Sequence, residues 1–182
     1  GTTAKPRQLH NTQFGVICPA ETPEGGACGL VKNMSMICHY SMYHSPDIII
    51  DMLDELGIKY EREFNDKEED DDKEEDNCIT IFVNGKLIGF TTNGDEIYND
   101  LKNKKRNGVL HFDISISFNK FELFIFTNAG RVCKPFLIVE NNSIKLTPTH
   151  ITQIRDNKIS WNDLVTSNII EYQDTAEQEQ CL

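Results

Sequence analysis

Long apolar runs are missing from this sequence of 182 residues. No stretch approaches the roughly 20 residues that a membrane-spanning helix needs, and Gly1–Arg7 lacks the apolar region of a secretory signal peptide. The first residue is not methionine, so we expect a piece of a longer chain. Because no secretory signal is evident, we expect the six cysteines to be reduced thiols of an intracellular protein.

Recognisable metal, phosphate and catalytic motifs are also missing. The cysteines show neither C-x₂-C nor C-x₄-C spacing, and the five histidines are not clustered, so we expect no metal site. Gly25, Gly26 and Gly29 are not followed by the Lys-Ser/Thr pair of a phosphate-binding loop. Glu21 and Glu24 lie in a Pro-rich turn without a partner residue that completes an acid–base mechanism. The residues alone therefore predict no self-contained catalytic site.

Negative charge dominates the chain. The 29 Asp and Glu residues against 18 Lys and Arg residues give a net charge of −11, and nine of the acids stand with two lysines in Asp66–Asp76. Such a balance repels a phosphate backbone, which argues against a free-standing nucleic-acid-binding protein. Because the acidic run cannot bury apolar surface, we expect residues 65–77 to form a disordered insertion. The alternative is a self-standing acidic module that recruits basic partners through this run.

The order of the expected elements predicts an α+β fold in three parts. Residues 1–43 are rich in Gly, Pro and small residues and should form loops and short strands. Residues 44–111 indicate a small domain of helices and a hairpin, and residues 112–182 a β-rich segment. The strongest local signal is Asn84-Gly85 between two apolar strands, which is typical of a hairpin turn with two positive φ angles.

Two helices are expected in the middle part. The first begins at Ser45, an N-cap residue followed by proline, and ends at Gly57. The second spans Asp95–Arg106, and its Lys102–Arg106 stretch is expected to be a solvated face that complements the helix dipole. The expected apolar faces are Ile48, Ile49, Met52, Leu53 and Leu56 in the first helix, and Ile97, Tyr98 and Leu101 in the second.

The third part combines strands with a short helix. Alternation of apolar and polar residues predicts a half-buried strand in Phe112–Phe118. Pro135 indicates an edge strand or a bulge, and Ser160 begins a helix with a capping-box pattern. The polar stretch Asp174–Gln180 is interpreted as the cut end of a longer chain.

A long motif in the first part carries a family resemblance. It consists of Arg7–Gly15 (RQLHNTQFG), Cys18–Gly25 (CPAETPEG) and Ala27–Asn33 (ACGLVKN). The motif is similar to the fork-region signature of the second-largest subunits of multisubunit RNA polymerases. Asn11 after His10 is most similar to the polymerase II branch, and polymerase III, archaeal and viral relatives are the alternatives.

The resemblance extends along most of the chain. Phe82–Gly85 with Gly89, and the basic helix end Leu101–Gly108, are similar to the family's external-2 domain. Thr127–Glu140 is similar to the start of its hybrid-binding region, and Ile170–Tyr172 with Asp174–Glu179 to the acidic segment that follows. The resemblance therefore implies three parts of a larger subunit: a fork segment (1–43), an external-2-like domain (44–111) and the start of the hybrid-binding region (112–182).

The family synthesises RNA on a DNA template with two Mg²⁺ ions. The resemblance implies that their ligands lie outside this chain, so the chain has no catalytic residue, no metal ligand and no cofactor, and is inert alone. It places Arg7 and Gln8 near the template, the RNA–DNA hybrid or the nucleotide, and Glu24 near the nucleotide site. The expected partners are other polymerase subunits, chiefly the largest, with template DNA and hybrid, in the nucleus and without a membrane.

Overall fold

The computed structural model describes residues 3–60 and 78–180. The disordered insertion expected at residues 65–77 lies outside this part of the chain. Helices and mixed sheets confirm the expected α+β fold. In the described ranges, no helix has the length and apolar character that crossing a membrane requires.

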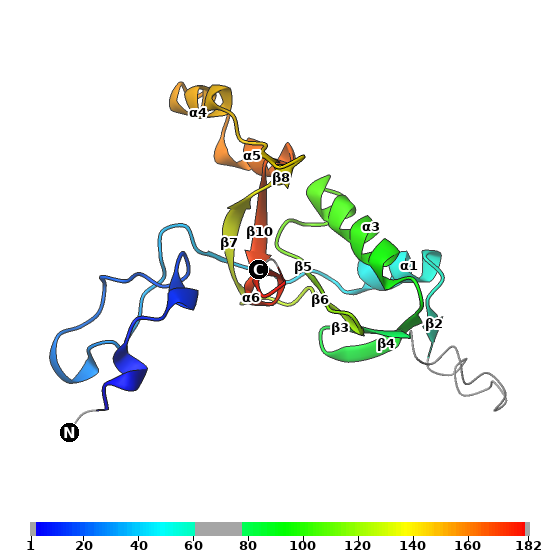
Figure 1. The fold of residues 1–182 in the computed structure, drawn as a ribbon, viewed down its shortest axis with the longest axis horizontal. Helices are drawn as coiled ribbons and strands as arrows, with labels where there is room; N and C mark the ends of the chain where they lie inside the picture. Colours follow the sequence, from blue (N-terminus) through cyan, green and yellow to red (C-terminus); the bar gives the residue numbers. More distant parts are fainter. Residues whose placement is uncertain (1–2, 61–77, 181–182) are drawn as a thin grey trace.

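The largest core forms where two helices, α1 (Asp47–Glu55) and α3 (Gly94–Arg106), pack on a five-stranded sheet (Figure 1). The strands, in order across the sheet, are β2 (Lys59–Tyr60), β4 (Lys86–Thr91), β3 (Ile79–Val83), β6 (Glu122–Phe126) and β5 (Ser115–Phe118). β3 and β6 are parallel, and the other neighbours are antiparallel. The sheet therefore takes strands from both sides of the expected boundary between residues 111 and 112.

The hairpin predicted at Asn84-Gly85 is confirmed. Asn84 has a φ of +50° and Gly85 a φ of +78°, the left-handed pair that this tight turn requires. The Asn84 amide also binds the end of β6, because Nδ2 donates to Thr127 Oγ1 at 2.9 Å and Oδ1 accepts from Thr127 N–H at 2.8 Å. The turn is thus fixed to a strand distant in sequence.

Helix α1 begins at Asp47, with Pro46 rather than the predicted Ser45 at its N-cap, and has a narrower apolar face than expected. Ile49 and Leu53 are fully buried, whereas Ile48 is 54% and Leu56 38% exposed. A helix of nine residues covers the sheet with one stripe only, which leaves the flanking apolar residues uncovered in this chain. The end of the helix at Gly57, with a φ of +74°, agrees with the prediction.

The strand predicted at Phe112–Phe118 begins only at Ser115, and the prediction that it is half-buried is wrong, because β5 is buried on both faces. Ser115 and Ser117 are as buried as Ile116 between them. The reason is α6 (Thr175–Gln178), which the polar end of the chain forms beside β5. Ile116 N–H donates to Glu177 Oε1 at 3.2 Å, and Ser117 Oγ donates to the Ala176 carbonyl at 3.3 Å. A covered edge strand buries its polar residues because a neighbour supplies their hydrogen bonds.

A second, three-stranded sheet lies beside the first (Figure 1). Its order is β1 (His39–Tyr40), β7 (Val132–Leu137) and β10 (Ile170–Asp174), all antiparallel. Beyond it follow the hairpin β8 (Val139–Glu140) and β9 (Ser143–Ile144) and the helices α4 (Pro148–Arg155) and α5 (Trp161–Thr166). β1 pairs only with Val132 and Cys133 of β7. At Pro135, β7 therefore has β10 as its one strand neighbour among the described residues, which agrees with the edge position predicted for this proline. The capping box predicted at Ser160 is confirmed.

The last part of the fork segment supplies β1 to the second sheet, and the residues before it extend away from both sheets (Figure 1). It contains three short 3₁₀ helices, η1 (Lys5–Arg7), η2 (Asn11–Gln13) and η3 (Gly25–Ala27), and no residue from 3 to 40 is buried. Met34, Met36 and Ile37 are 37%, 103% and 50% exposed. Exposed apolar area of this kind is typical of a surface that another chain covers.

Candidate functional site

The fork segment folds into a loop that is closed at its base by backbone hydrogen bonds. Ile17 and Met34 form an isolated β-bridge. On either side of it, Cys18 N–H donates to the Asn33 carbonyl at 2.8 Å and Ser35 N–H donates to the Val16 carbonyl at 3.0 Å. The residues between Cys18 and Asn33 therefore form one closed loop that contains η3.

The Arg7 side chain, which lies outside this loop in the sequence, binds it by hydrogen bonds. Its Nη1 donates to the Gly26 carbonyl at 2.7 Å and to the Cys28 carbonyl at 2.9 Å. Among the described residues, Nε and Nη2 of Arg7 have no hydrogen-bond partner. The guanidinium is thus fixed by one nitrogen and keeps an edge of two donors, the geometry that binds a phosphate or carboxylate bidentately.

Gly29 allows the loop to approach Arg7 this closely. Its φ is +74°, and a Cβ at this position lies 2.4 Å from the Arg7 carbonyl oxygen. Gly29 N–H also donates to Thr22 Oγ1 at 2.8 Å, while Thr22 Oγ1 donates to the Val31 carbonyl at 3.1 Å. Thr22 and Gly29 therefore fix the inside of the loop, and Arg7 fixes the outside.

Gln8 and Glu24 are exposed on the same part of the molecule. Gln8 follows η1 in extended conformation, directly after Arg7. Glu24 precedes η3, and its side chain makes no capping hydrogen bond to that helix. Arg7 contacts the η3 turn that Glu24 begins, so the sequence-predicted residues flank one turn, but the structure shows no ion pair between Arg7 and Glu24 among the described residues.

In addition to β1, Lys134 on β7 connects the outer part of the fork segment to the second sheet. Its Nζ donates to the Phe14 carbonyl at 2.8 Å and lies 5.7 Å from the Phe14 ring centroid and 5.2 Å from that of Phe136. A hollow of about 470 Å³ opens next to this contact, with Leu9, Phe14, Ile17 and Pro19 in its wall. The contact orients the fork segment but leaves its apolar side chains exposed.

Sequence reasoning missed a buried network of charges between α3 and the end of the chain. Lys102 and Lys105 were expected on a solvated face, yet both are buried. Lys102 Nζ donates to Glu171 and, at 3.0 Å, to Glu177 Oε1. Lys105 Nζ donates to Glu177 Oε2 at 2.9 Å, and Arg106 Nε to Glu171 Oε2 at 2.8 Å. These three cations and two carboxylates join α3 to β10 and α6.

The sequence contained a signal for the basic side of this network but none that identified its acidic partners. Lys102 and Lys105 are three residues apart and lie on one helix face, and the polar end of the chain supplies the acids. Asp174 caps α6 by accepting from Glu177 N–H at 3.0 Å, and it pairs with Arg131 Nη1 at 3.0 Å. Which helix face meets which acid depends on the tertiary fold, because more than 60 residues separate them.

The Glu171 carboxylate makes this attachment sensitive to acid. Burial alone raises the pKa of Glu171, but the positive charges of Lys102 and Lys105 outweigh burial and lower this pKa from 4.5 to about 2. The folded chain keeps the carboxylate ionised at pH values where the unfolded chain takes up a proton. This difference stabilises the fold by about 3 kcal/mol at neutral pH.

We expect the stability that Glu171 contributes to be fully present above about pH 4.5 and to be lost as the pH falls towards about 2, because the folded pKa is lowered. Urea unfolding at a series of pH values measures it, with a loss of about 2 kcal/mol by about pH 3. Glu171→Gln should remove this part of the pH dependence, and Glu96→Gln on the exposed side of α3 should keep it. An unchanged pH dependence in Glu171→Gln contradicts the assignment.

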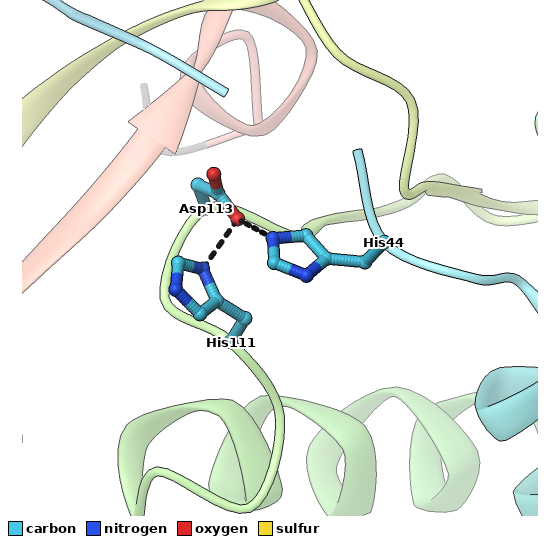
Figure 2. A group of neighbouring side chains, drawn as sticks. All are labelled: His44, His111 and Asp113. Carbon is cyan, nitrogen blue, oxygen red and sulfur yellow. Dashed lines mark hydrogen bonds and ion pairs between the residues drawn. The ribbon is translucent and has the colours of Figure 1, made fainter. Parts of the chain in front are cut away.

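A second cluster that the sequence did not predict surrounds Asp113, after the end of α3 (Figure 2). His44 Nε2 lies 2.8 Å and His111 Nδ1 2.7 Å from Asp113 Oδ1. Oδ2 accepts from Met42 N–H at 2.7 Å, and His39 Nε2 lies 3.8 Å from it. Burial alone raises the pKa of Asp113, but the hydrogen bonds from Met42 and His111 and the charges of the histidines hold it below its ordinary value. The spacing of the histidines along the chain gave no sign that the fold brings three of the five together at Asp113.

Comparison with known proteins identifies the family. The sequence model of "RNA polymerase Rpb2, domain 3" matches residues 1–39, and that of "RNA polymerase Rpb2, domain 4" matches residues 81–140. The chain is 37% identical over 181 residues to the RNA polymerase II subunit RPB2 of Encephalitozoon cuniculi, which covers 98% of this chain and 15% of that protein. It is 36% identical over 198 residues to the RPB2 of Schizosaccharomyces pombe, with 98% and 16% covered.

Other polymerases are less similar. The RNA polymerase III subunit RPC2 of Drosophila melanogaster is 29% identical over 175 residues, with 95% of this chain and 15% of that protein covered. The chain spans about one sixth of the length of these relatives. The family-model matches cover most of the fork segment and most of the five-stranded sheet, so they favour a polymerase subunit over an independent acidic module. The chain belongs to the Rpb2 family, the second-largest subunits of DNA-directed RNA polymerases, and is most like the polymerase II members among these relatives.

Proposed function

We propose that this chain forms the fork side of the active centre of RNA polymerase II and takes part there in template-directed RNA synthesis. The observation that supports it best is the exposed edge of Arg7, with two free donors held beside Gln8 on a segment that matches Rpb2 domain 3. In the described part, the fork segment contains three basic residues and only two acidic ones, although the chain carries a net charge of −11. Its charge therefore permits a nucleic acid at close range.

Each exposed side chain has a distinct proposed role. The guanidinium of Arg7 binds a backbone phosphate of the template, the hybrid or the nucleotide, because it presents two parallel donors. The amide of Gln8 donates to or accepts from a sugar or base. The carboxylate of Glu24 orders basic groups near the nucleotide, since no capping bond to its own helix engages it.

The potential metal ligands in the described part of the chain do not suit the two Mg²⁺ ions of the family's reaction. The group of three potential ligands found within the described ranges contains two imidazoles and one carboxylate. Mg²⁺ prefers octahedral oxygen ligands, so this group does not suit the catalytic ions. We therefore propose that they bind elsewhere in the polymerase, that the chain has no catalytic residue, and that it is inert alone.

The partners proposed are the other polymerase subunits, chiefly the largest, together with template DNA and RNA–DNA hybrid in the nucleus. The exposed apolar side chains of the fork segment support a protein partner, since Phe14 is 79% and Met36 103% exposed. Purification of the tagged chain from a nuclear extract tests this proposal. Co-purification of a polymerase largest subunit with template-directed RNA synthesis supports it, and a chain without either overturns it. Binding lost with the acidic run Asp66–Asp76 would favour the interaction module instead.

Replacing Arg7 by alanine should slow nucleotide addition in the assembled polymerase by about 10- to 100-fold, because a charge-assisted hydrogen bond to phosphate contributes about 1.5–3 kcal/mol. Single-turnover extension of an RNA primer on a DNA template measures the rate. The control is Lys120→Ala in the exposed β5–β6 turn, which removes a positive charge remote from the fork segment. Equal rates for Arg7→Ala and Lys120→Ala would remove Arg7 from the nucleic-acid site.

A further inference from the structure

Three side chains that the proposed function does not use converge in one place. His44 comes from the segment that leads from the fork segment into α1, and His111 and Asp113 come from the loop after α3 (Figure 2). Their ligand atoms, two imidazole nitrogens and a carboxylate oxygen, all lie within 4.8 Å of one another. Imidazole and carboxylate are the donors that Zn²⁺ and related divalent ions take in proteins.

The backbone positions these ligands before any ion binds. His44 N–H donates to the Thr127 carbonyl at 2.9 Å, and Ser41 N–H to the Arg131 carbonyl at 2.9 Å, so residues 41–44 lie along the turn after β6. Arg131 Nη2 donates to the Asp113 carbonyl at 2.8 Å, which fixes the other side of the cluster. Preorganised ligands lower the free-energy cost of forming a metal site.

The carboxylate already has the surroundings of a metal ligand. Its Oδ2 is bound by Met42 N–H at 2.7 Å, which leaves Oδ1 to face the two imidazoles. Metal-ligating carboxylates are commonly held by such a second hydrogen bond. In tetrahedral coordination at about 2.0–2.1 Å from the metal, ligand atoms are about 3.3 Å apart, so each N–O separation must grow by only about 0.5 Å.

The charge of the cluster also favours a cation. The Asp113 side chain is completely buried, and no lysine or arginine in the described ranges forms an ion pair with it. His39 Nε2, a further buried nitrogen 3.8 Å from Oδ2, has no hydrogen-bond partner. A buried carboxylate requires a compensating positive charge, which either the protonated histidines or a divalent ion supplies. The His111 side chain is 43% exposed and leaves a path for its entry.

We propose that His44, His111 and Asp113 bind one divalent transition-metal ion, Zn²⁺ by the nature of the donors, with water in the remaining coordination position. Such an ion joins the exit of the fork segment to the loop after α3. The ion is thus a structural cross-link between the fork segment and the five-stranded sheet. It is separate from the catalytic Mg²⁺ ions, whose oxygen ligands it lacks.

The first test is metal analysis of the assembled polymerase that contains this chain. The complex is dialysed against Zn²⁺ and then against metal-free buffer, and its zinc content is measured by mass spectrometry. We expect the His111→Gln complex to contain one zinc ion fewer per complex than wild type, and the His150→Gln complex, altered on remote α4, to match wild type. Equal zinc contents in the wild-type, His111→Gln and His150→Gln complexes overturn the proposal, because the cluster then binds no metal ion.

A second test needs no variant, so it holds even if His111→Gln impairs assembly. Histidines of the wild-type complex are modified with diethyl pyrocarbonate, with and without Zn²⁺, and each site is quantified by peptide mass spectrometry. At a Zn²⁺ concentration ten times the dissociation constant, protection of His44 and His111 should be about tenfold and reversed by a chelator. His150 should react equally in both conditions. Equal reactivity of His44 and His111 with and without Zn²⁺ contradicts the site.

Discussion

Replacing Glu177 by glutamine should reduce the free energy of unfolding by about 3–5 kcal/mol, the cost of removing one partner from a buried ion pair. Glu177 receives hydrogen bonds from Lys102, Lys105 and the Ile116 backbone. The neutral amide leaves two buried ammonium groups with one carboxylate, Glu171, between them. Domains have a total stability of about 5–15 kcal/mol, so this loss is a large fraction of it. We expect α6 to detach from α3 in the variant.

Chemical unfolding of the chain measures this loss, with hydrogen exchange at α6 as a local readout. Glu179→Gln is the matched control, because Glu179 follows the same helix and is exposed. This control should change stability by less than about 0.5 kcal/mol. If Glu177→Gln and Glu179→Gln unfold alike, the buried network does not hold the end of the chain to α3.

Replacing Gly29 by alanine should disrupt the fork loop and reduce RNA synthesis by the assembled polymerase about tenfold or more, since every 1.4 kcal/mol is a factor of ten. The left-handed φ alone costs about 1–2 kcal/mol for a residue with a Cβ. The new methyl group also meets the Arg7 carbonyl oxygen at 2.4 Å, so the backbone of Arg7 must move. Arg7 then loses the position from which its free donors face the nucleic acid.

Gly26→Ala provides the matched control for this prediction. Gly26 lies in the same loop, but its φ is not left-handed and a Cβ there meets no atom within 4 Å. Primer extension and limited proteolysis of the fork segment should therefore remain close to wild type. Equal effects of the two substitutions would show that the close approach at Gly29 does not support the site.

Local signals predicted the elements that depend on neighbouring residues. The Asn84-Gly85 turn, the end of α1 at Gly57 and the capping box at Ser160 all follow from the conformational preferences of one or two residues. The Gly- and Pro-rich composition of residues 1–43 likewise indicated loops and short strands. In each case the interaction that determines the structure lies within a few residues.

The features that were missed depend on contacts between distant residues. The polar end of the chain forms α6 and covers β5, which is why Ser115 and Ser117 are buried against their alternation pattern. Lys102 is buried because Glu171 and Glu177 meet it from far along the sequence. Periodicity describes which residues share a face but does not state what covers that face. The histidine cluster was missed for the same reason, since His44 and His111 are adjacent only in the fold.

Photocrosslinking from the fork segment is the most direct test of the proposal that this segment faces nucleic acid. A photoreactive amino acid replaces Gln8 in the assembled polymerase, which is then halted on a labelled DNA template with a labelled RNA. The same amino acid at Trp161, exposed on α5, is the control. We predict that position 8 crosslinks to the template or the RNA and that position 161 does not. Crosslinks from position 8 to protein alone would contradict a nucleic-acid-facing fork segment.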